Sequence, residues 1–271
     1  MMLVVLTAGC SGPGLLSDRN PAVLRIKGSD SMALLTQRLA EAFMKVHPDI
    51  SVYAEGGGTG DGISAMINGT IDIASCSRPL SSEEVQQLAS RYRTLGVSVM
   101  IARDALSIIV HPSNGLTTLT YDHIEKIYTG EIVSWNDVGS TEMPIVAYSR
   151  EPNSGTYVYF EDHVLLGNSF GSHIRMMPGA QALVRAVAQD SAGIGYSTSA
   201  YIRDVKTLAV DGIIPSVDNV RNGTYPIARY FYLYTPFIPE GNTKIFIDWV
   251  ISEEGQRFVQ QSGYIPLYDL P

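Results

Sequence analysis

Residues 50–69 read ISVYAEGGGTGDGISAMING, and this stretch decides the fold class. Its first five residues place apolar side chains at every second position, which is typical of a half-buried β-strand. From Ile63 to Ile67 the apolar side chains recur at helical spacing. The glycine-rich segment Glu55–Gly62 joins these two parts. The stretch therefore predicts a strand that leads through a glycine-rich loop into the N-terminus of a helix.

Three further units of this kind occur along the chain. In each, a short apolar run precedes a polar loop and a helical pattern follows; the loops are Gly28–Ser31, Ser77–Ser81 and Ser149–Tyr157. The helix predicted after the first loop stops at His47-Pro48 and has an apolar face formed by Met32, Leu35, Leu39, Phe43 and Val46. This alternation of strands and helices predicts an α/β fold.

The four loops are also candidate anion-binding elements. The first N–H groups of a helix have no internal partner and carry the positive end of the helix dipole, so they bind anions without a cationic side chain. Glycine lets the backbone approach a ligand closely. Turn glycines and N-cap residues are a sufficient explanation for any one loop. The four loops together predict an oxyanion site.

Arg150 supplies a cation to the fourth loop. Its guanidinium group matches two oxygens of a tetrahedral oxyanion, and Ser154 and Thr156 add hydroxyl groups at the predicted helix start. The alternative is a surface ion pair of Arg150 with Glu151 or another acid. Glu151 is also a candidate for orienting the arginine toward a ligand.

Composition excludes several classes of protein. The chain has 271 residues with 19 Lys+Arg against 27 Asp+Glu, a net charge of −8, which argues against a nucleic-acid-binding protein. The only cysteines are Cys10 and Cys76, and the five histidines show no ligand spacing, so we expect neither a metal nor another cofactor. No P-loop, His-Glu-x-x-His or Gly-x-Ser-x-Gly motif is present. These motifs therefore give no sign of an enzyme, and we expect Cys76 to be a small buried side chain.

The N-terminal segment has the character of an export signal. Residues 1–10 end in Leu6-Thr7-Ala8-Gly9-Cys10, which resembles the bacterial lipobox. This resemblance implies that Cys10 is acylated, palmitate being one such group, and that residues 11–21 form a tether to the cell membrane. The alternative is a frayed apolar terminus with an ordinary cysteine.

Longer motifs identify a family. They are, in chain order, Gly28–Met32, Gly56–Gly62, Asp72–Leu80, Ile127–Gly139, Ser149–Arg150 with Ser154–Thr156, Gly193–Tyr196, Glu254–Gln256 and Gly263–Leu267. With these motifs the chain resembles, from Leu24 to Leu267, the PstS-like family of phosphate-binding proteins that serve phosphate-specific ABC transporters.

The resemblance implies a two-lobed periplasmic-binding-protein fold of type II. Each lobe is expected to be a mixed sheet flanked by helices, with the ligand cleft between the lobes. The implied lobes are residues 22–108 with 232–271, and residues 109–231. The chain would cross between them at residues 105–111 and 225–234, and one C-terminal helix over residues 244–261 would rejoin the first lobe.

The resemblance also implies the binding residues and partners. The family's phosphate-binding positions correspond to Ser29, Asp30, Ser31, Thr59, Ser77, Arg150, Ser154, Gly155 and Thr156. The implied partners are inorganic phosphate and the permease subunits of an ABC transporter. The resemblance implies a binding protein and not an enzyme. We expect a monomeric, extracytoplasmic lipoprotein whose contact with the membrane is a lipid anchor.

One position departs from the family pattern. Many members have an aspartate where this chain has Ser77, and that carboxylate accepts a hydrogen bond from a protonated phosphate oxygen. We hypothesise that Asp30, which stands where those members have a threonine, takes over this role. The alternative is that Asp30 is the N-cap of a helix that starts at Ser31 or Met32.

The departure leaves other functions open. A receptor for sulfate, molybdate or tungstate would use the same donors. A phosphatase-like enzyme would use the same anion cradle together with a metal or a nucleophile. A sensory or adhesive surface protein would keep the fold and lose the transport role.

Overall fold

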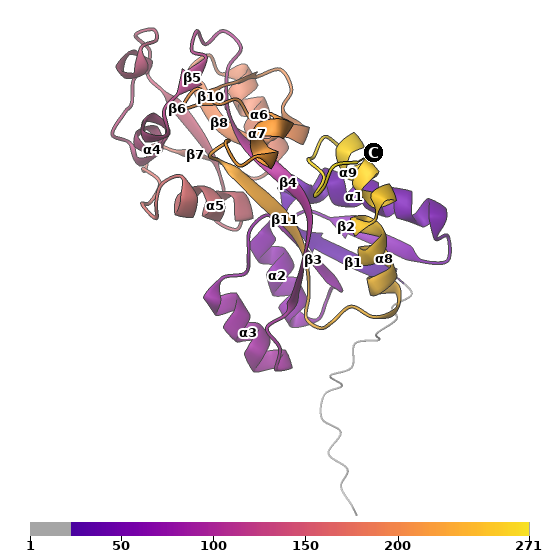
Figure 1. The fold of residues 1–271 in the computed structure, drawn as a ribbon. Helices are drawn as coiled ribbons and strands as arrows, with labels where there is room; N and C mark the ends of the chain where they lie inside the picture. Colours follow the sequence, from indigo (N-terminus) through magenta and orange to yellow (C-terminus); the bar gives the residue numbers. More distant parts are fainter. Residues whose placement is uncertain (1–22, 271) are drawn as a thin grey trace, which may run out of the picture.

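The computed structural model describes residues 23–270 (Figure 1). Its strands are β1 (Val23–Gly28), β2 (Ser51–Glu55), β3 (Ile73–Cys76), β4 (Val97–Val110), β5 (Thr118–Leu119), β6 (Val146–Arg150), β7 (Arg175–Met177), β8 (Gly193–Thr198), β9 (Lys206–Thr207), β10 (Ala209–Val210) and β11 (Ala228–Thr235). Its α-helices are α1 (Asp30–Val46), α2 (Thr59–Asn68), α3 (Ser82–Tyr92), α4 (Tyr121–Thr129), α5 (Gly155–His163), α6 (Ala180–Gln189), α7 (Val217–Arg221), α8 (Gly241–Ile251) and α9 (Glu253–Gln261). Two 3₁₀ turns span Trp135–Val138 and Ser199–Tyr201.

The main sheet is mixed and has the strand order β2-β1-β3-β11-β4-β8-β6-β7. Strands β2, β1 and β3 pair in parallel at one end, and β8, β6 and β7 pair in parallel at the other. The antiparallel strands β4 and β11 lie between the two ends. The first half of β4 pairs with β11 and its last residues, from Leu106 to Val110, pair with β8. Because β4 changes partners along its length, it links the two halves of the sheet.

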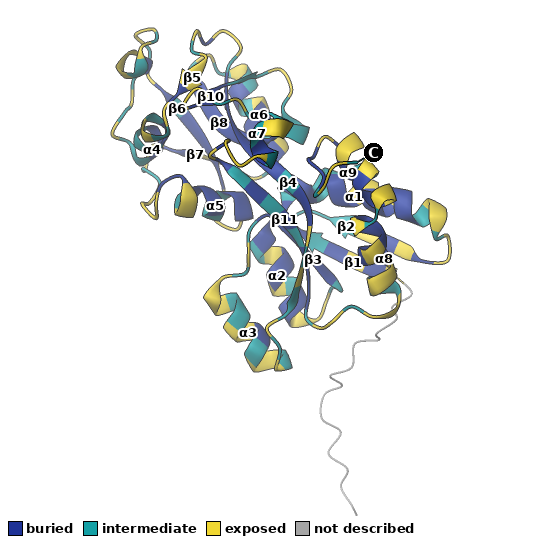
Figure 2. Cartoon of the chain, viewed as in Figure 1, coloured by how far each residue is buried: buried dark blue, intermediate teal, exposed yellow. Residues whose placement is uncertain are grey.

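The first lobe consists of β1–β3 with helices on both faces (Figure 1). On one face, α1, α8 and α9 share a core with the sheet that includes Leu24, Phe43 and Phe246. On the other face, α2 and α3 contribute Ile63 and Leu88 to a smaller core. Figure 2 shows these inner faces buried and the outer faces of the helices exposed.

The second lobe consists of β5–β10 with α4–α7 (Figure 1). Tyr128 of α4 and Phe160 of α5 lie in a core on one face of the sheet, and Leu183 and Val187 of α6 cover the other face. The α/β, two-lobed architecture expected from the sequence is therefore confirmed. Strand β4 begins at Val97, before the expected crossing segment 105–111. Strand β11 spans Ala228–Thr235 and is offset from the expected segment 225–234.

Two local expectations about α1 and α2 were wrong. The face of α1 that was expected to be apolar does not include Val46, which is 47% exposed in the last turn. Helix α2 begins at Thr59, earlier than the apolar spacing indicates, because its first turn is built from glycine and polar residues. Gly62 in that turn packs against β1 so closely that an added methyl group would lie 2.5 Å from the carbonyl oxygen of Lys27.

The C-terminal segment forms two helices where one was expected. Ser252 has extended backbone dihedral angles, ends α8 and caps α9, whose Gly255 N–H it accepts. A methyl group on Gly255 would lie 2.2 Å from the carbonyl oxygen of Trp249, so the two helices meet at a sharp bend that requires glycine. Both helices pack on the first lobe, as expected. In the part of the chain that is described, no helix has the length and apolar character of a bilayer-crossing segment.

Candidate anion-binding site

Three helices begin at the point where the two lobes meet. Ser31 in the first turn of α1 shares a 2.8 Å hydrogen bond with Thr156 in the first turn of α5. Thr59 is the first residue of α2, and a methyl group on Gly155 at the start of α5 would lie 2.4 Å from its Oγ1. The positive ends of three helix dipoles therefore converge at one place, as an oxyanion site requires.

Buried hydroxyl groups line this meeting point. Thr59 Oγ1 lies 3.2 Å from Ser77 Oγ and accepts the backbone N–H of Ser77 at 3.2 Å. Ser154 is the N-cap of α5 and accepts the N–H of Thr156 at 3.2 Å. All of these side chains are buried. A hydroxyl that accepts a fixed N–H keeps its own proton to donate, so each of them is a potential donor to an anion.

Arg150 is the cation of the site and is 2% exposed. It is the last residue of β6, and its guanidinium group donates from Nε to the carbonyl of Met177 at 3.3 Å and from Nη2 to that of Pro178 at 3.0 Å. Its ion pair is with Asp30 of the first lobe, at 2.5 Å between Nη2 and Oδ2. Of the two partners that the sequence left open, Glu151 or another acid, the structure supplies another acid, Asp30, and Glu151 is exposed. The pair is not at the surface, because the Arg150 side chain is buried. Nη1 of Arg150 is buried and has no hydrogen-bond partner among residues 23–270.

Asp30 is held by both lobes. Its Oδ1 accepts the N–H of Gly57 at 2.8 Å, and its Oδ2 faces Arg150. The alternative reading of Asp30 as an N-cap is wrong, because α1 starts at Asp30 and Ser29 is the N-cap. Ser29 donates its N–H to the carbonyl of Ser75 at 2.8 Å, and its side chain makes no capping hydrogen bond.

The structure thus brings together most of the residues that the sequence indicated. Contacts join Asp30 to Arg150, Ser31 to Thr156, and Thr59 to Ser77 and Gly155, with Ser154 one residue away. Ser29 is linked to these residues only through the backbone, as the residue that precedes Asp30. Cys10 lies outside the described residues. Cys76, next to Ser77, is fully buried and free, as expected, and burial raises the pKa of its thiol.

Sequence reasoning missed a second buried cation at the site. Arg229 of β11 forms a buried ion pair with Asp104 of β4, at 2.9 Å between Nη2 and Oδ2. Its Nη1 donates to Thr156 Oγ1 at 3.0 Å. The signal in the sequence is the presence of Arg103 and Asp104 in β4 and of Arg229 in β11, inside two largely apolar strands. Such charges are buried only when they are paired.

Two tyrosines support the backbone on either side of the site. Tyr196 accepts the N–H of Arg150 at 3.3 Å and lies 2.6 Å from Ser149 Oγ; burial raises the pKa of Tyr196 to about 12, although these two contacts oppose the shift. Tyr201 of the second lobe donates to the carbonyl of Asp30 at 2.9 Å. Burial also raises the pKa of Tyr201, so both hydroxyl groups remain donors at neutral pH.

Asn153 makes a further set of bonds between the lobes. Its carbonyl oxygen accepts the N–H of Gly60 at 3.1 Å, and its Nδ2 donates to Gly57 O and Asp61 Oδ2, both at 3.2 Å. Asp61 is an exposed acid in the first turn of α2, and it also takes part in this interlobe contact. The chain is therefore in a conformation in which the two lobes are joined across the site.

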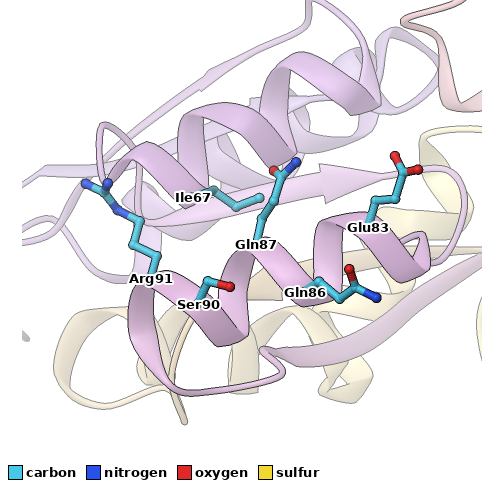
Figure 3. A pocket seen from close by; sticks show the side chains of 6 residues that line it. All are labelled: Ile67, Glu83, Gln86, Gln87, Ser90 and Arg91. Atoms are coloured by element: carbon cyan, nitrogen blue, oxygen red, sulfur yellow. The ribbon is translucent and has the colours of Figure 1, made fainter.

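A pocket of about 690 Å³ lies elsewhere, on the outer surface between α2 and α3 (Figure 3). It is lined by Ile67, Glu83, Gln86, Gln87, Ser90 and Arg91. Five of these six residues are exposed, and the lining contains charges of both signs. It has neither the buried donors nor the converging helix N-termini of the interlobe site, so the interlobe site is the better candidate for binding an anion.

Comparison with known proteins gives relatives over nearly the whole chain. Residues 17–254 match the PBP superfamily domain. The phosphate-binding protein PstS of Pseudomonas aeruginosa is 30% identical, in an alignment that covers 89% of this chain and 81% of that protein. The phosphate-binding protein PstS of Bacillus subtilis is 29% identical, in an alignment that covers 99% of this chain and 91% of that one.

Solved structures agree with these relatives. A putative phosphate ABC transporter substrate-binding protein with bound phosphate from Clostridium perfringens has a TM-score of 0.84 and 31% identity, covering 91% of this chain and all (100%) of that one. An ABC-type phosphate transport receptor from Vibrio cholerae has a TM-score of 0.75 and 28% identity, covering 89% of this chain and 99% of that one. These proteins are named for binding and transport, so the expectation of a binding protein and not an enzyme is confirmed. The chain belongs to the PBP superfamily and, within it, to the PstS-like family of phosphate-binding proteins.

Proposed function

We propose that this chain captures inorganic phosphate outside the cytoplasm and delivers it to the permease of an ABC importer. The observation that carries the proposal is Nη1 of Arg150, a buried cationic donor without a partner among the described residues, beside buried hydroxyls and three helix N-termini. An unpaired buried donor is costly, and an oxyanion would satisfy it. The relatives named as phosphate-binding proteins support phosphate as that oxyanion.

Phosphate would bind by replacing bonds that the site residues make with one another. We propose that its oxygens accept from Arg150, from the hydroxyls of Ser31, Thr59, Ser77, Ser154 and Thr156, and from the N–H groups of Gly155 and the neighbouring helix starts. Ser29 would contribute as the N-cap residue of α1, directly before Asp30 and Ser31. Residues 22–108 with 232–271 and residues 109–231 would move as the two lobes, with β4 and β11 as the hinge.

Asp30 is proposed as the acceptor for the proton of phosphate. A carboxylate has about four lone-pair sites, and the bonds from Gly57 N–H and Arg150 use two of them. The remaining sites would accept the P–O–H group, for which the hydroxyl of Ser77 is a weaker acceptor than the aspartate found there in other members. Sulfate has no proton to donate at neutral pH, and it would meet only repulsion from Asp30.

Isothermal titration with a panel of anions tests the function. Phosphate and arsenate, which have the same shape and protons, are expected to bind with similar affinity, and sulfate and molybdate much more weakly. A ligand present at about 100 times its dissociation constant also adds about 2.7 kcal/mol to the free energy of unfolding, so a thermal shift provides an independent readout. Absence of both heat and thermal shift with phosphate would refute the proposal.

A second candidate is a receptor for another tetrahedral oxyanion. The observation that favours it is Ser77, which leaves position 77 without the carboxylate that excludes fully ionised anions in other members. Tighter binding of sulfate, molybdate or tungstate than of phosphate in the same panel would establish this function in place of the first.

We also propose that Cys10 carries the lipid anchor and that the protein acts as a monomer. Support for the anchor comes from the lipobox-like sequence that ends at Cys10. In cells, the Cys10→Ser variant is expected to move from the membrane fraction to the soluble fraction, and mass spectrometry should detect the acyl groups on the native protein only. Equal partition of both proteins would contradict the anchor.

A further inference from the structure

Arg229 and Asp104 form a buried ion pair on the two strands that join the lobes. They are register partners in the β4–β11 ladder, and they are 6% and 0% exposed. Arg229 Nε donates to Asp104 Oδ2 at 3.0 Å, and Thr198 donates to Asp104 Oδ1 at 2.5 Å. The guanidinium group also stacks near the rings of Tyr159 and Phe231, at 5.5 and 5.0 Å. These contacts hold Arg229 in one orientation.

That orientation directs Nη1 toward the anion site. Nη1 lies 3.0 Å from Thr156 Oγ1 in the second lobe and 3.5 Å from the carbonyl oxygen of Ser77 in the first. An arginine can only donate, so Thr156 Oγ1 must accept this bond. The single hydroxyl proton of Thr156 then has to be donated elsewhere, and in this structure Ser31 Oγ lies 2.8 Å away.

Thr59 has the same arrangement with a different donor. There the backbone N–H of Ser77 occupies the acceptor side of Oγ1, which leaves the Thr59 proton free for Ser77 Oγ or for a ligand. Arg229 does for Thr156 what that backbone N–H does for Thr59. A site for an oxyanion needs its hydroxyls in the donating orientation, and fixing them beforehand removes a cost of binding.

We propose that Arg229, held by Asp104, is a positioning residue that fixes the Thr156 hydroxyl as a donor to the bound anion. This inference rests on the proposed function, since it assumes that the anion binds at Thr156. Arg229 acts through Thr156 without touching the ligand. Its bonds to residues of both lobes also tie the hinge strands to the closed arrangement of the site.

A double-mutant cycle measured by phosphate titration tests this role. The Asp104→Asn/Arg229→Gln variant replaces the ion pair with an amide pair, so no buried charge is left uncompensated and the net charge is unchanged. The glutamine side chain is too short to reach Thr156. The second arm is Thr156→Val, which keeps the shape of the side chain and removes the hydroxyl, and the third combines all three changes. Arg103→Gln is the matched control. Arg103 lies on β4 next to Asp104, but it donates to the carbonyls of Arg221 and Leu267, away from the site.

We expect the amide-pair variant to bind phosphate about tenfold more weakly or worse, and Arg103→Gln to bind like the native chain. If Arg229 acts through Thr156, the combined variant binds phosphate no more than about twofold more weakly than Thr156→Val alone. Native affinity in the amide-pair variant would overturn the proposal. So would a loss of affinity in the combined variant that equals the product of the losses in the amide-pair variant and in Thr156→Val. Thermal unfolding of each variant shows that it is folded. Failure of the native chain to bind phosphate would refute the proposed function and not this role alone.

Discussion

Oδ2 of Asp30 lies 2.5 Å from Nη2 of Arg150, although 120 positions separate the two residues in the chain. One residue begins the first helix of the first lobe, and the other ends a strand of the second. The pair therefore forms only when the lobes come together. It places a negative charge inside an anion site, which is unfavourable for a fully ionised ligand and favourable for one that carries a proton.

Replacing Asp30 with asparagine separates two roles of this carboxylate. If Asp30 accepts the phosphate proton, Asp30→Asn reduces the preference for phosphate over sulfate by about a hundredfold or more, because sites built around one ligand hydrogen bond discriminate by about 10⁴-fold. If Asp30 only orients Arg150, both anions weaken together and their ratio stays constant. Isothermal titration with both anions distinguishes these results. Asp122→Asn, an exposed acid in the first turn of α4, is the control and should change neither affinity.

Gly155 is a point of close contact between the lobes. A methyl group there would lie 2.4 Å from Thr59 Oγ1 and 2.6 Å from Ser77 Oγ, whereas the backbone at Gly155 is helical and accepts alanine. Gly155→Ala is expected to oppose closure at a cost of about 1–3 kcal/mol, or about 5- to 150-fold in phosphate affinity, with little loss of thermal stability.

The control for this variant is Gly179→Ala, where nothing lies within 4 Å of the added methyl group. It caps α6 in the second lobe, so it tests the general effect of alanine at a helix start. Equal affinities for the two alanine variants would contradict the role of Gly155 in closure.

The elements around the site were predictable because their signals are local. The loop at Gly28–Ser31 and the capped start of α3 are defined by neighbouring residues, and both occur where expected; Ser81 and Glu84 form a full capping box. The break at Ser252 was missed, although residues 252–257 contain no apolar side chain and Ser252 followed by acids is itself a helix-start signal.

The pairing of charges was not predictable because it depends on the tertiary fold. Adjacency in sequence favoured Glu151 as the partner of Arg150, and the fold supplies Asp30 from the other lobe. Arg229 and Asp104 are 125 residues apart, and only the β4–β11 register places them opposite each other. A single sequence shows that each buried charge needs a partner, and it does not show which one.

Asn153 is expected to control how long the lobes stay closed. Its Nδ2 bonds to Gly57 O and Asp61 Oδ2 are lost in Asn153→Ala, and each is worth about 0.5–1.5 kcal/mol, or about 2- to 12-fold in an equilibrium constant. Because these bonds form only on closure, the loss should appear as faster phosphate dissociation in stopped-flow measurements, with an unchanged association rate.

A matched variant for this test is Asn168→Ala. The amide of Asn168 bonds to Glu125 within the second lobe, so its loss affects an exposed hydrogen bond that does not link the lobes. We expect phosphate to dissociate from this variant at the native rate. A native rate of phosphate dissociation from Asn153→Ala as well would contradict the interlobe role of Asn153.

Buried tyrosines make the fold sensitive to alkali. Burial raises the pKa values of Tyr159 and Tyr196 from 10.0 to about 12. Above pH 10 the unfolded chain loses these protons and the folded chain keeps them, so the free energy of unfolding decreases as pH rises. The stabilisation is fully present below about pH 10 and is lost as pH approaches 12, with a slope of about 1.4 kcal/mol per pH unit for each tyrosine.

Urea unfolding between pH 8 and 11.5 measures this slope. Tyr159→Phe loses the hydrogen bond to the Ala228 carbonyl, so it is less stable at pH 8, but its stability should decrease less steeply above pH 10 than that of the native chain. Tyr268→Phe, at an exposed position, should keep the native slope. If Tyr159→Phe also keeps the native slope, Tyr159 ionises equally in the folded and unfolded chains, and its burial is not the source of the alkaline sensitivity.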